Sequence, residues 1–143
     1  MKKNFKKDNY LISTDKSRLD INIIHNFLSN SYWAKNRSLK TTKLTIKNSL
    51  CFGIYFKQDQ IGFARVITDY ATFAYLADVF VLEDFRGKGL SKWLMEVILN
   101  YSELQNLRRW FLATRDAHKL YEKFGFKPLS EPEKLMEMFR KDL

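Results

Sequence analysis

Hydrophobic residues change their spacing several times along the chain, and each change predicts a different element. Helical spacing of apolar side chains predicts a first helix through residues 19–28, capped by Asp15 or Ser17. A second, shorter helix is expected to begin at Ser38 or Thr41. These helices precede a long stretch that is rich in strand-forming residues.

Seven segments rich in β-branched and aromatic residues, or with alternating polarity, predict strands. They are residues 10–13, 50–57, 61–68, 72–81 and 109–114, with closing edge strands at 126–129 and 134–139. The run at 72–81 holds a single charged residue, Asp78, which predicts a central strand covered on both faces. Two later helices are expected, from about Gly89 to Tyr101 and from Asp116 to Phe124.

The order of these elements predicts an α/β (α+β) fold in one domain over residues 1–143, with residues 1–8 as a basic, flexible tail. The strands at 72–81 and 109–114 enclose a helix, so they should be parallel with a right-handed crossover. The preceding strands are joined by tight turns and should be antiparallel. We therefore expect a mixed, mostly antiparallel central sheet with helices on both faces.

Composition narrows the partners but does not choose one. The net charge of +9 favours anionic partners, namely nucleic acid, anionic lipid or a polyphosphate cofactor. No apolar run approaches the roughly 20 residues of a membrane helix, and no secretory signal is present, so we expect a cytoplasmic protein. Cys51 lies in an apolar run, where a buried hydrophobe is expected rather than a nucleophile. Two histidines and one cysteine offer no metal-ligand spacing.

A glycine loop lies between the central strand and the clearest amphipathic helix. Its residues are Arg86, Gly87, Lys88, Gly89, Leu90 and Ser91. Glycines let a phosphate approach the backbone, and a helix N-terminus offers free N–H groups. Lys92 stands where a dinucleotide fingerprint has its third glycine, and the spacing does not fit a P-loop. The alternative is a turn that binds nothing.

A second motif follows the next strand: Ala117-x-x-Leu120-Tyr121-x-x-x-Gly125-Phe126. Together with the earlier Arg86-x-x-Gly89-x-Ser91, this order resembles the GNAT superfamily of N-acetyltransferases. Each motif alone is weak, but both in order, separated by a helix and a strand, are specific.

The resemblance implies a GNAT-like fold with acetyl-CoA as cosubstrate and no metal. In the family, the cofactor lies where two parallel strands splay apart, with its pyrophosphate on the glycine loop and its pantetheine arm along the central strand. The cofactor-binding residues implied here are Val79, Phe80, Val81, Arg86, Gly87, Lys88, Gly89, Leu90, Ser91 and Asp116. Asp116 departs from the pattern, because the family often has asparagine there.

Two residues are candidates for catalysis. The resemblance assigns Tyr121 as the general acid that protonates the CoA thiolate, the alternative being a core aromatic. Asp78 is the candidate base, because an apolar strand would raise the pKa of its carboxyl group. The alternative for Asp78 is a structural or bulge residue. A backbone N–H near Phe80 is the implied donor to the developing oxyanion.

The acceptor is expected to be a small-molecule or peptide primary amine, with aminoacyl-tRNA left open. Tyr32 and Trp33, in the loop between the first two helices, are expected to line its site rather than only pack. The protein could be a monomer or a homodimer. Two other functions stay open: a catalytically silent acyl-CoA-binding domain, and a basic nucleic-acid-binding module, for which no recognition motif is seen.

Overall fold

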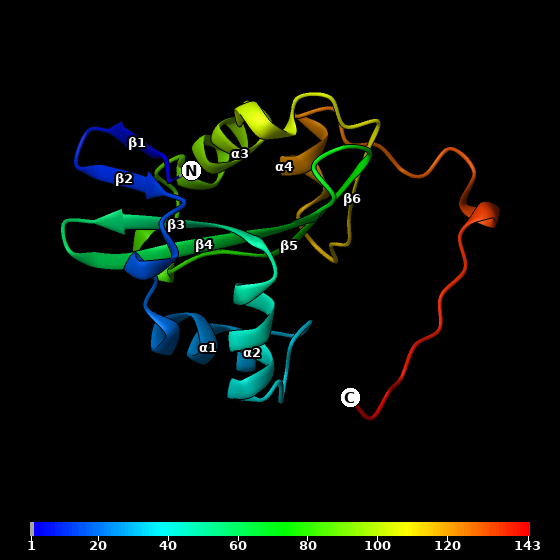
Figure 1. Ribbon diagram of the computed structural model, residues 1–143, viewed down its shortest axis with the longest axis horizontal. Helices are drawn as coiled ribbons and strands as arrows, with labels where there is room; N and C mark the ends of the chain where they lie inside the picture. The colour runs from blue at the N-terminus through cyan, green and yellow to red at the C-terminus, as the bar shows by residue number, and fades with distance from the viewer. Residues whose placement is uncertain (1) are drawn as a thin grey trace. The chain divides into compact units, whose positions relative to one another are not determined.

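The computed structural model describes residues 2–143. The chain forms two compact units, one ending at Ala113 and one from Thr114 to Leu143, and each is described by itself. The first unit holds a six-stranded sheet whose strand order follows the chain (Figure 1). The strands are β1 (Asn4–Lys7), β2 (Tyr10–Ser13), β3 (Leu50–Phe56), β4 (Asp59–Thr68), β5 (Phe73–Val81) and β6 (Arg109–Leu112).

Strand pairing confirms the mixed sheet. Each pair from β1 to β5 is antiparallel, and β5 pairs with β6 in parallel. The helices are α1 (Ile21–Ser29), α2 (Leu39–Lys47) and α3 (Leu90–Leu99) in the first unit and α4 (His118–Glu122) in the second. Because α3 joins β5 to β6, the predicted strand–helix–strand unit is present.

Helices cover both faces of the sheet in the first unit: α1 and α2 lie on one face and α3 on the other (Figure 1). The core under α1 and α2 consists of Ile24, Leu28, Ala34, Cys51, Phe63 and Phe80. The apolar side of α3 contributes the buried side chains Leu90, Trp93, Leu94, Met95, Val97 and Ile98. This arrangement explains why β5 reads as an almost unbroken apolar run.

Short polar side chains set where α1 and α2 begin. Asp20 accepts hydrogen bonds from the N–H groups of Asn22 and Ile23, so it caps α1 in place of the predicted Asp15 or Ser17. Asp15 instead caps a single 3-10 turn before it. The predicted cap of the second helix, Ser38, is confirmed.

Other predictions need correction. Residues 4–7, predicted as part of a flexible tail, form β1, because they pair antiparallel with residues 10–13 and a hydrogen bond from Thr14 N–H to the Lys3 carbonyl oxygen extends this pairing. The segments 126–129 and 134–139 form no strand, since no neighbouring strand satisfies their backbone within the described residues. Cys51 is buried as expected, and burial raises the pKa of its thiol to about 11.

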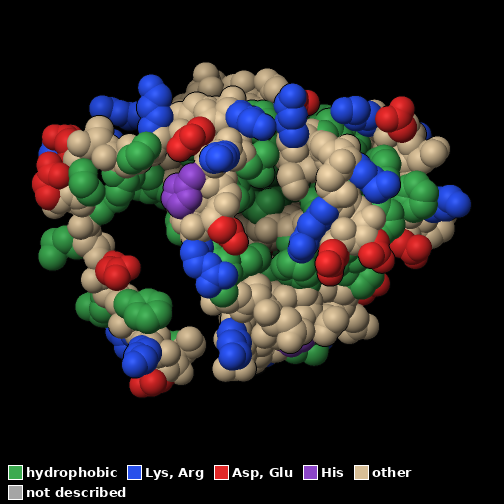
Figure 2. Space-filling view, turned by 180° about the vertical axis from the view of Figure 1, so that it is seen from behind, with side chains coloured by type: hydrophobic (Ala, Val, Ile, Leu, Met, Phe, Trp, Pro, Cys, Tyr) green, Lys and Arg blue, Asp and Glu red, His purple; other side chains and the backbone are tan. Residues whose placement is uncertain are grey.

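Basic residues do not gather into one stripe on the face drawn in Figure 2. Lysine and arginine side chains are spread over that face with acidic side chains among them. Within residues 2–143, no helix combines the length and the apolar character needed to cross a membrane.

Candidate functional site

The glycine loop follows β5 and leads directly into α3. Gly87 and Gly89 have φ values of 76° and 77°, the left-handed region that glycine adopts without strain. A Cβ atom at either position would meet no atom within 4 Å, so the space above the loop is open. The first N–H groups of α3, at residues 90–92, have no acceptor in the described chain, as expected for the first turn of a helix. The loop therefore offers several free donors to an anion.

The Arg86 side chain holds the loop against the strand before it. Its Nε donates to the Val81 carbonyl oxygen at 2.9 Å, which joins the end of β5 to the loop. This contact uses one guanidinium donor of a side chain that is otherwise exposed.

Half of β5 has no strand partner on the β6 side. β6 pairs only with Phe73–Leu76, so residues 77–81 lie beyond its reach within the described chain. This free edge includes the predicted cofactor-binding residues Val79, Phe80 and Val81. An extended ligand can pair with such an edge as an added strand would.

A bulge interrupts the other edge of β5 at Asp78. Phe63 pairs with Phe80 and Arg65 with Ala77, so Asp78 and Val79 stand opposite Ala64 alone. The φ of Asp78 is 53°, a left-handed value that aspartate tolerates better than most residues. The bulge turns the Asp78 side chain away from the regular alternation of the strand.

Three side chains from distant parts of the chain meet the Asp78 carboxylate, which is 1% exposed. Arg65 Nε donates to Oδ2 at 2.6 Å, and Arg37 Nη1 donates to the same oxygen at 2.8 Å. Trp33 Nε1 donates to Oδ1 at 2.9 Å. We call Trp33, Arg37, Arg65 and Asp78 the Asp78 cluster.

The premise for Asp78 as a base is wrong. Burial acts to raise its pKa, but the hydrogen bond from Arg37 and the charge of Arg65 outweigh burial, so the pKa is lowered. A carboxylate held in its charged form is a weak proton acceptor. Arg65 lies 13 residues away in the chain and Arg37 lies 41 away, beyond the range of local sequence patterns.

The predicted acceptor loop lies against β5. Tyr32 and Trp33 are 45% and 40% exposed, and their rings meet edge to face with centroids 5.1 Å apart. Trp33 also contacts Phe27, which stacks on Phe80 of β5 at 4.1 Å. The structure thus brings the two aromatic residues and Asp78 together, while their contact with an acceptor stays a prediction.

Sequence reasoning did not predict that Arg37 and Arg65 would pair with Asp78. One signal was present for Arg65, which is a cation in an apolar strand next to the apolar strand that holds Asp78. Opposite charges in neighbouring apolar strands indicate a buried pair. Arg37, in a polar loop, carried no comparable signal.

Tyr121 and Asp116 belong to the second unit. The Tyr121 side chain is buried, and its ring meets Phe126 edge to face at 6.0 Å. Asp116 is exposed, just before α4. The catalytic role of Tyr121 and the cofactor contact of Asp116 stay predictions.

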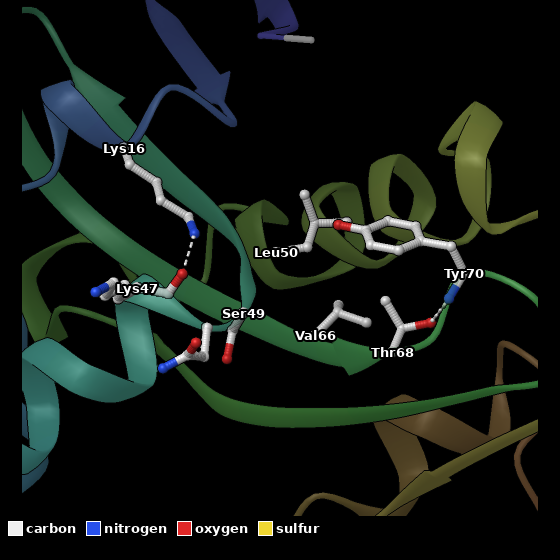
Figure 3. A pocket seen from close by; sticks show the side chains of 8 residues that line it. Lys16, Lys47, Ser49, Leu50, Val66, Thr68 and Tyr70 are labelled. Atoms are coloured by element: carbon white, nitrogen blue, oxygen red, sulfur yellow. Dashed lines mark hydrogen bonds between the residues drawn. The ribbon is translucent and has the colours of Figure 1, made fainter.

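A pocket of about 220 Å³ opens at the end of the sheet where β3 begins and β4 ends (Figure 3). Its lining includes Lys16, Lys47, Ser49, Leu50, Thr68 and Tyr70. None of the predicted site residues lines it. One wall touches the Asp78 cluster, because Ser49 Oγ accepts a hydrogen bond from Arg65 Nη1 at 3.2 Å.

The sequence matches a known family. A family model described as an acetyltransferase (GNAT) domain matches residues 47–128, which include β5, the glycine loop and Tyr121. A protein from Gibberella zeae that carries an acetyltransferase name is 30% identical over 150 residues, covering 90% of this chain and 85% of the relative.

Solved structures share the fold. A GNAT-family protein from Xanthomonas campestris has a TM-score of 0.91 and 50% identity, covering 94% of this chain and 95% of its own. A GNAT acetyltransferase from Elizabethkingia anophelis, solved with acetyl-CoA bound, has a TM-score of 0.67 at 14% identity and covers 94% of this chain and 91% of its own.

Proposed function

The chain belongs to the GNAT acetyltransferase family, and we propose that it transfers an acetyl group from acetyl-CoA to a primary amine by direct attack of the amine on the thioester. The observation that carries this proposal is the free edge of β5 at residues 77–81, which is followed, after Leu82 and the 3-10 turn Glu83–Phe85, by the open glycine loop. A thin, extended ligand with an anionic end matches those two features. The bound acetyl-CoA of the Elizabethkingia anophelis relative supports the choice of cosubstrate.

The residues present fit this cosubstrate. Residues 87–92 supply free backbone donors and open space for phosphates, and Arg86 and Lys88 supply positive charge. The edge of β5 at Val79, Phe80 and Val81 supplies backbone groups for the amide-containing arm. When bound, acetyl-CoA supplies an activated acyl group with a good leaving thiolate.

The transfer forms a C–N bond and breaks the C–S bond. The amine must be neutral to attack, although a lysine-like amine has a pKa of about 10.4. Because Asp78 is a weak base, we assign the proton of the amine to solvent water. A backbone N–H near Phe80 stabilises the negative charge that develops on the carbonyl oxygen. Tyr121 gives its proton to the departing thiolate.

We also propose a different role for Asp78. Its carboxylate holds Trp33 and Arg37 against β5, with Arg65 behind it. Asp78 therefore positions the loop that we expect to meet the acceptor, instead of taking a proton from it.

A substitution in the glycine loop tests the cofactor site. Gly89→Asn is expected to weaken acetyl-CoA binding by about 10-fold or more, roughly 1.4 kcal/mol. Asparagine tolerates the φ of 77°, so the loop conformation should survive while the side chain fills the open space. Calorimetric titration with acetyl-CoA measures the change.

The control is Gly125→Asn, which makes the same change at a positive φ of 93° outside the loop. Its affinity for acetyl-CoA should equal that of the unchanged protein. Equal affinity for all three folded proteins would show that the loop does not bind the cofactor. Turnover itself is tested by following thiol release with a panel of amines, and a protein that binds acetyl-CoA but acetylates none would be the silent binding domain.

A further inference from the structure

The Asp78 cluster carries one more positive than negative charge in a largely buried place. Arg37, Arg65 and Asp78 expose 17%, 11% and 1% of their side chains. Within residues 2–143, Asp78 supplies the only carboxylate within 4.0 Å of either guanidinium group. A partly buried charge without a counter-ion is costly, so this excess favours an anionic ligand.

The two guanidinium groups also have donors to spare. Each arginine side chain carries five N–H donors. Arg37 directs its two Nη atoms to Asp78, whereas Arg65 directs Nε to Asp78 and Nη1 to Ser49. Arg37 Nε and Arg65 Nη2 have no protein acceptor in the described chain. Neither atom is fully buried, because Tyr55 Oη is the only fully buried side-chain polar atom without a partner among the described residues.

The excess charge lies beside the proposed reaction site. Trp33 donates to the same carboxylate, and the Phe27 ring connects Trp33 to Phe80. Phe80 belongs to the β5 edge along which we place the thioester. Because Trp33 and Arg37 donate to the same carboxylate, an acceptor bound against Trp33 would lie close to the guanidinium group of Arg37.

We propose that the acceptor is an amine that also carries a carboxylate, and that Arg37 binds this carboxylate while Arg65 adds charge behind it. This inference rests on the proposed acetyl transfer. Guanidinium groups bind carboxylates through strong, charge-assisted hydrogen bonds. The same positive charge lowers the pKa of a nearby ammonium group, which raises the fraction of neutral, reactive amine without a protein base.

Matched acceptors test the inference. Each of the common α-amino acids is compared with its amide, which keeps the amine but lacks the carboxylate, first by acetyl transfer and then by calorimetric binding to the protein with CoA. We expect the acids to exceed their amides in kcat/KM, for at least one side chain, by about 10- to 100-fold, the factor expected for one charged hydrogen bond. Arg37→Gln should remove this preference, and Arg37→Lys should restore part of it.

Lys35→Gln is the matched control, because it removes one positive charge from the same loop at an exposed position outside the Asp78 cluster. It should keep the preference for acids. The melting temperature of each variant identifies any loss of folding. If Arg37→Gln does not fold, Arg37→Lys carries the test.

The outcomes separate the inference from the proposed function. If amides are acetylated or bound as well as their acids, or if neither class binds, the inference is wrong. If acids bind in preference to amides but no amine is acetylated, acetyl transfer is wrong while carboxylate recognition stands. If Arg37→Gln and Lys35→Gln reduce the preference equally, general positive charge explains it and the assignment to Arg37 fails.

Discussion

Asp78→Ala is expected to lower the free energy of unfolding by about 3–5 kcal/mol, the usual cost of removing one partner from a buried ion pair. The change leaves the Arg37 and Arg65 guanidinium groups facing each other without the carboxylate they share. It also removes the acceptor of Trp33 Nε1. Urea unfolding at neutral pH, followed by circular dichroism, measures the loss.

Two further variants separate charge from backbone conformation. Asp78→Asn keeps a side chain that tolerates φ of 53° but removes the charge. The decrease in its free energy of unfolding therefore measures the electrostatic contribution alone. Asp78→Ala combined with Arg37→Gln removes part of the unbalanced charge and should be less destabilised than the sum of the single changes. A decrease of less than about 1 kcal/mol in the free energy of unfolding of Asp78→Ala would mean that solvent screens the charges of the Asp78 cluster.

Acidification should reproduce part of the destabilisation expected for Asp78→Ala. The pKa of Asp78 is lowered in the folded protein, so its stabilising contribution is fully present above its unfolded pKa of about 3.9. That contribution is lost as the pH falls from there through the folded pKa. The unchanged protein should therefore lose stability below about pH 4 more steeply than Asp78→Asn does.

Tyr121→Phe is expected to lower turnover by about 10²-fold while acetyl-CoA affinity stays within about threefold. The change removes the hydroxyl group that we propose as the acid for the departing thiolate. A thiol with a pKa of about 8.5 already leaves well, so the effect should lie at the low end of general acid catalysis. Single-turnover measurement with an identified acceptor gives the chemical rate.

Tyr10→Phe is the matched control for Tyr121→Phe. Tyr10 lies in β2, far along the chain from both motifs, and loses the same single oxygen atom. Its rate should match that of the unchanged protein. If Tyr121→Phe turns over as fast as this control under conditions where chemistry limits the rate, Tyr121 is a packing residue.

Patterns within one element predicted most of the fold. β5 was predicted because a strand buried on both faces has a continuous run of apolar residues. α3 was predicted because a helix buried on one face has apolar residues at helical spacing. β1 was missed because four of the six residues after Met1 are lysines, which are uncommon in strands. The opposite error was made at residues 134–139, where a mostly apolar segment was predicted as a strand although no neighbouring strand pairs with it in the described chain.

The candidate site was predicted only in part for a related reason. The glycine loop is a local motif, and its position between β5 and α3 follows from the sequence. The charge state of Asp78 depends on Arg37 and Arg65, which the fold brings to it from another loop and another strand. Contacts of this kind depend on the tertiary structure, so the isolated carboxylate suggested a raised pKa where the pKa is lowered.

The position of β1 gives its lysines a protective role. β1 forms the outer edge of the sheet, and a bare edge can recruit a strand from another molecule. Lys6 and Lys7 lie in this strand, and charged side chains on an edge discourage such pairing between molecules. A chain shortened to begin at Tyr10 would expose β2, whose sequence Tyr-Leu-Ile-Ser carries no charge. We therefore expect the first hairpin to discourage separate molecules from pairing their sheets.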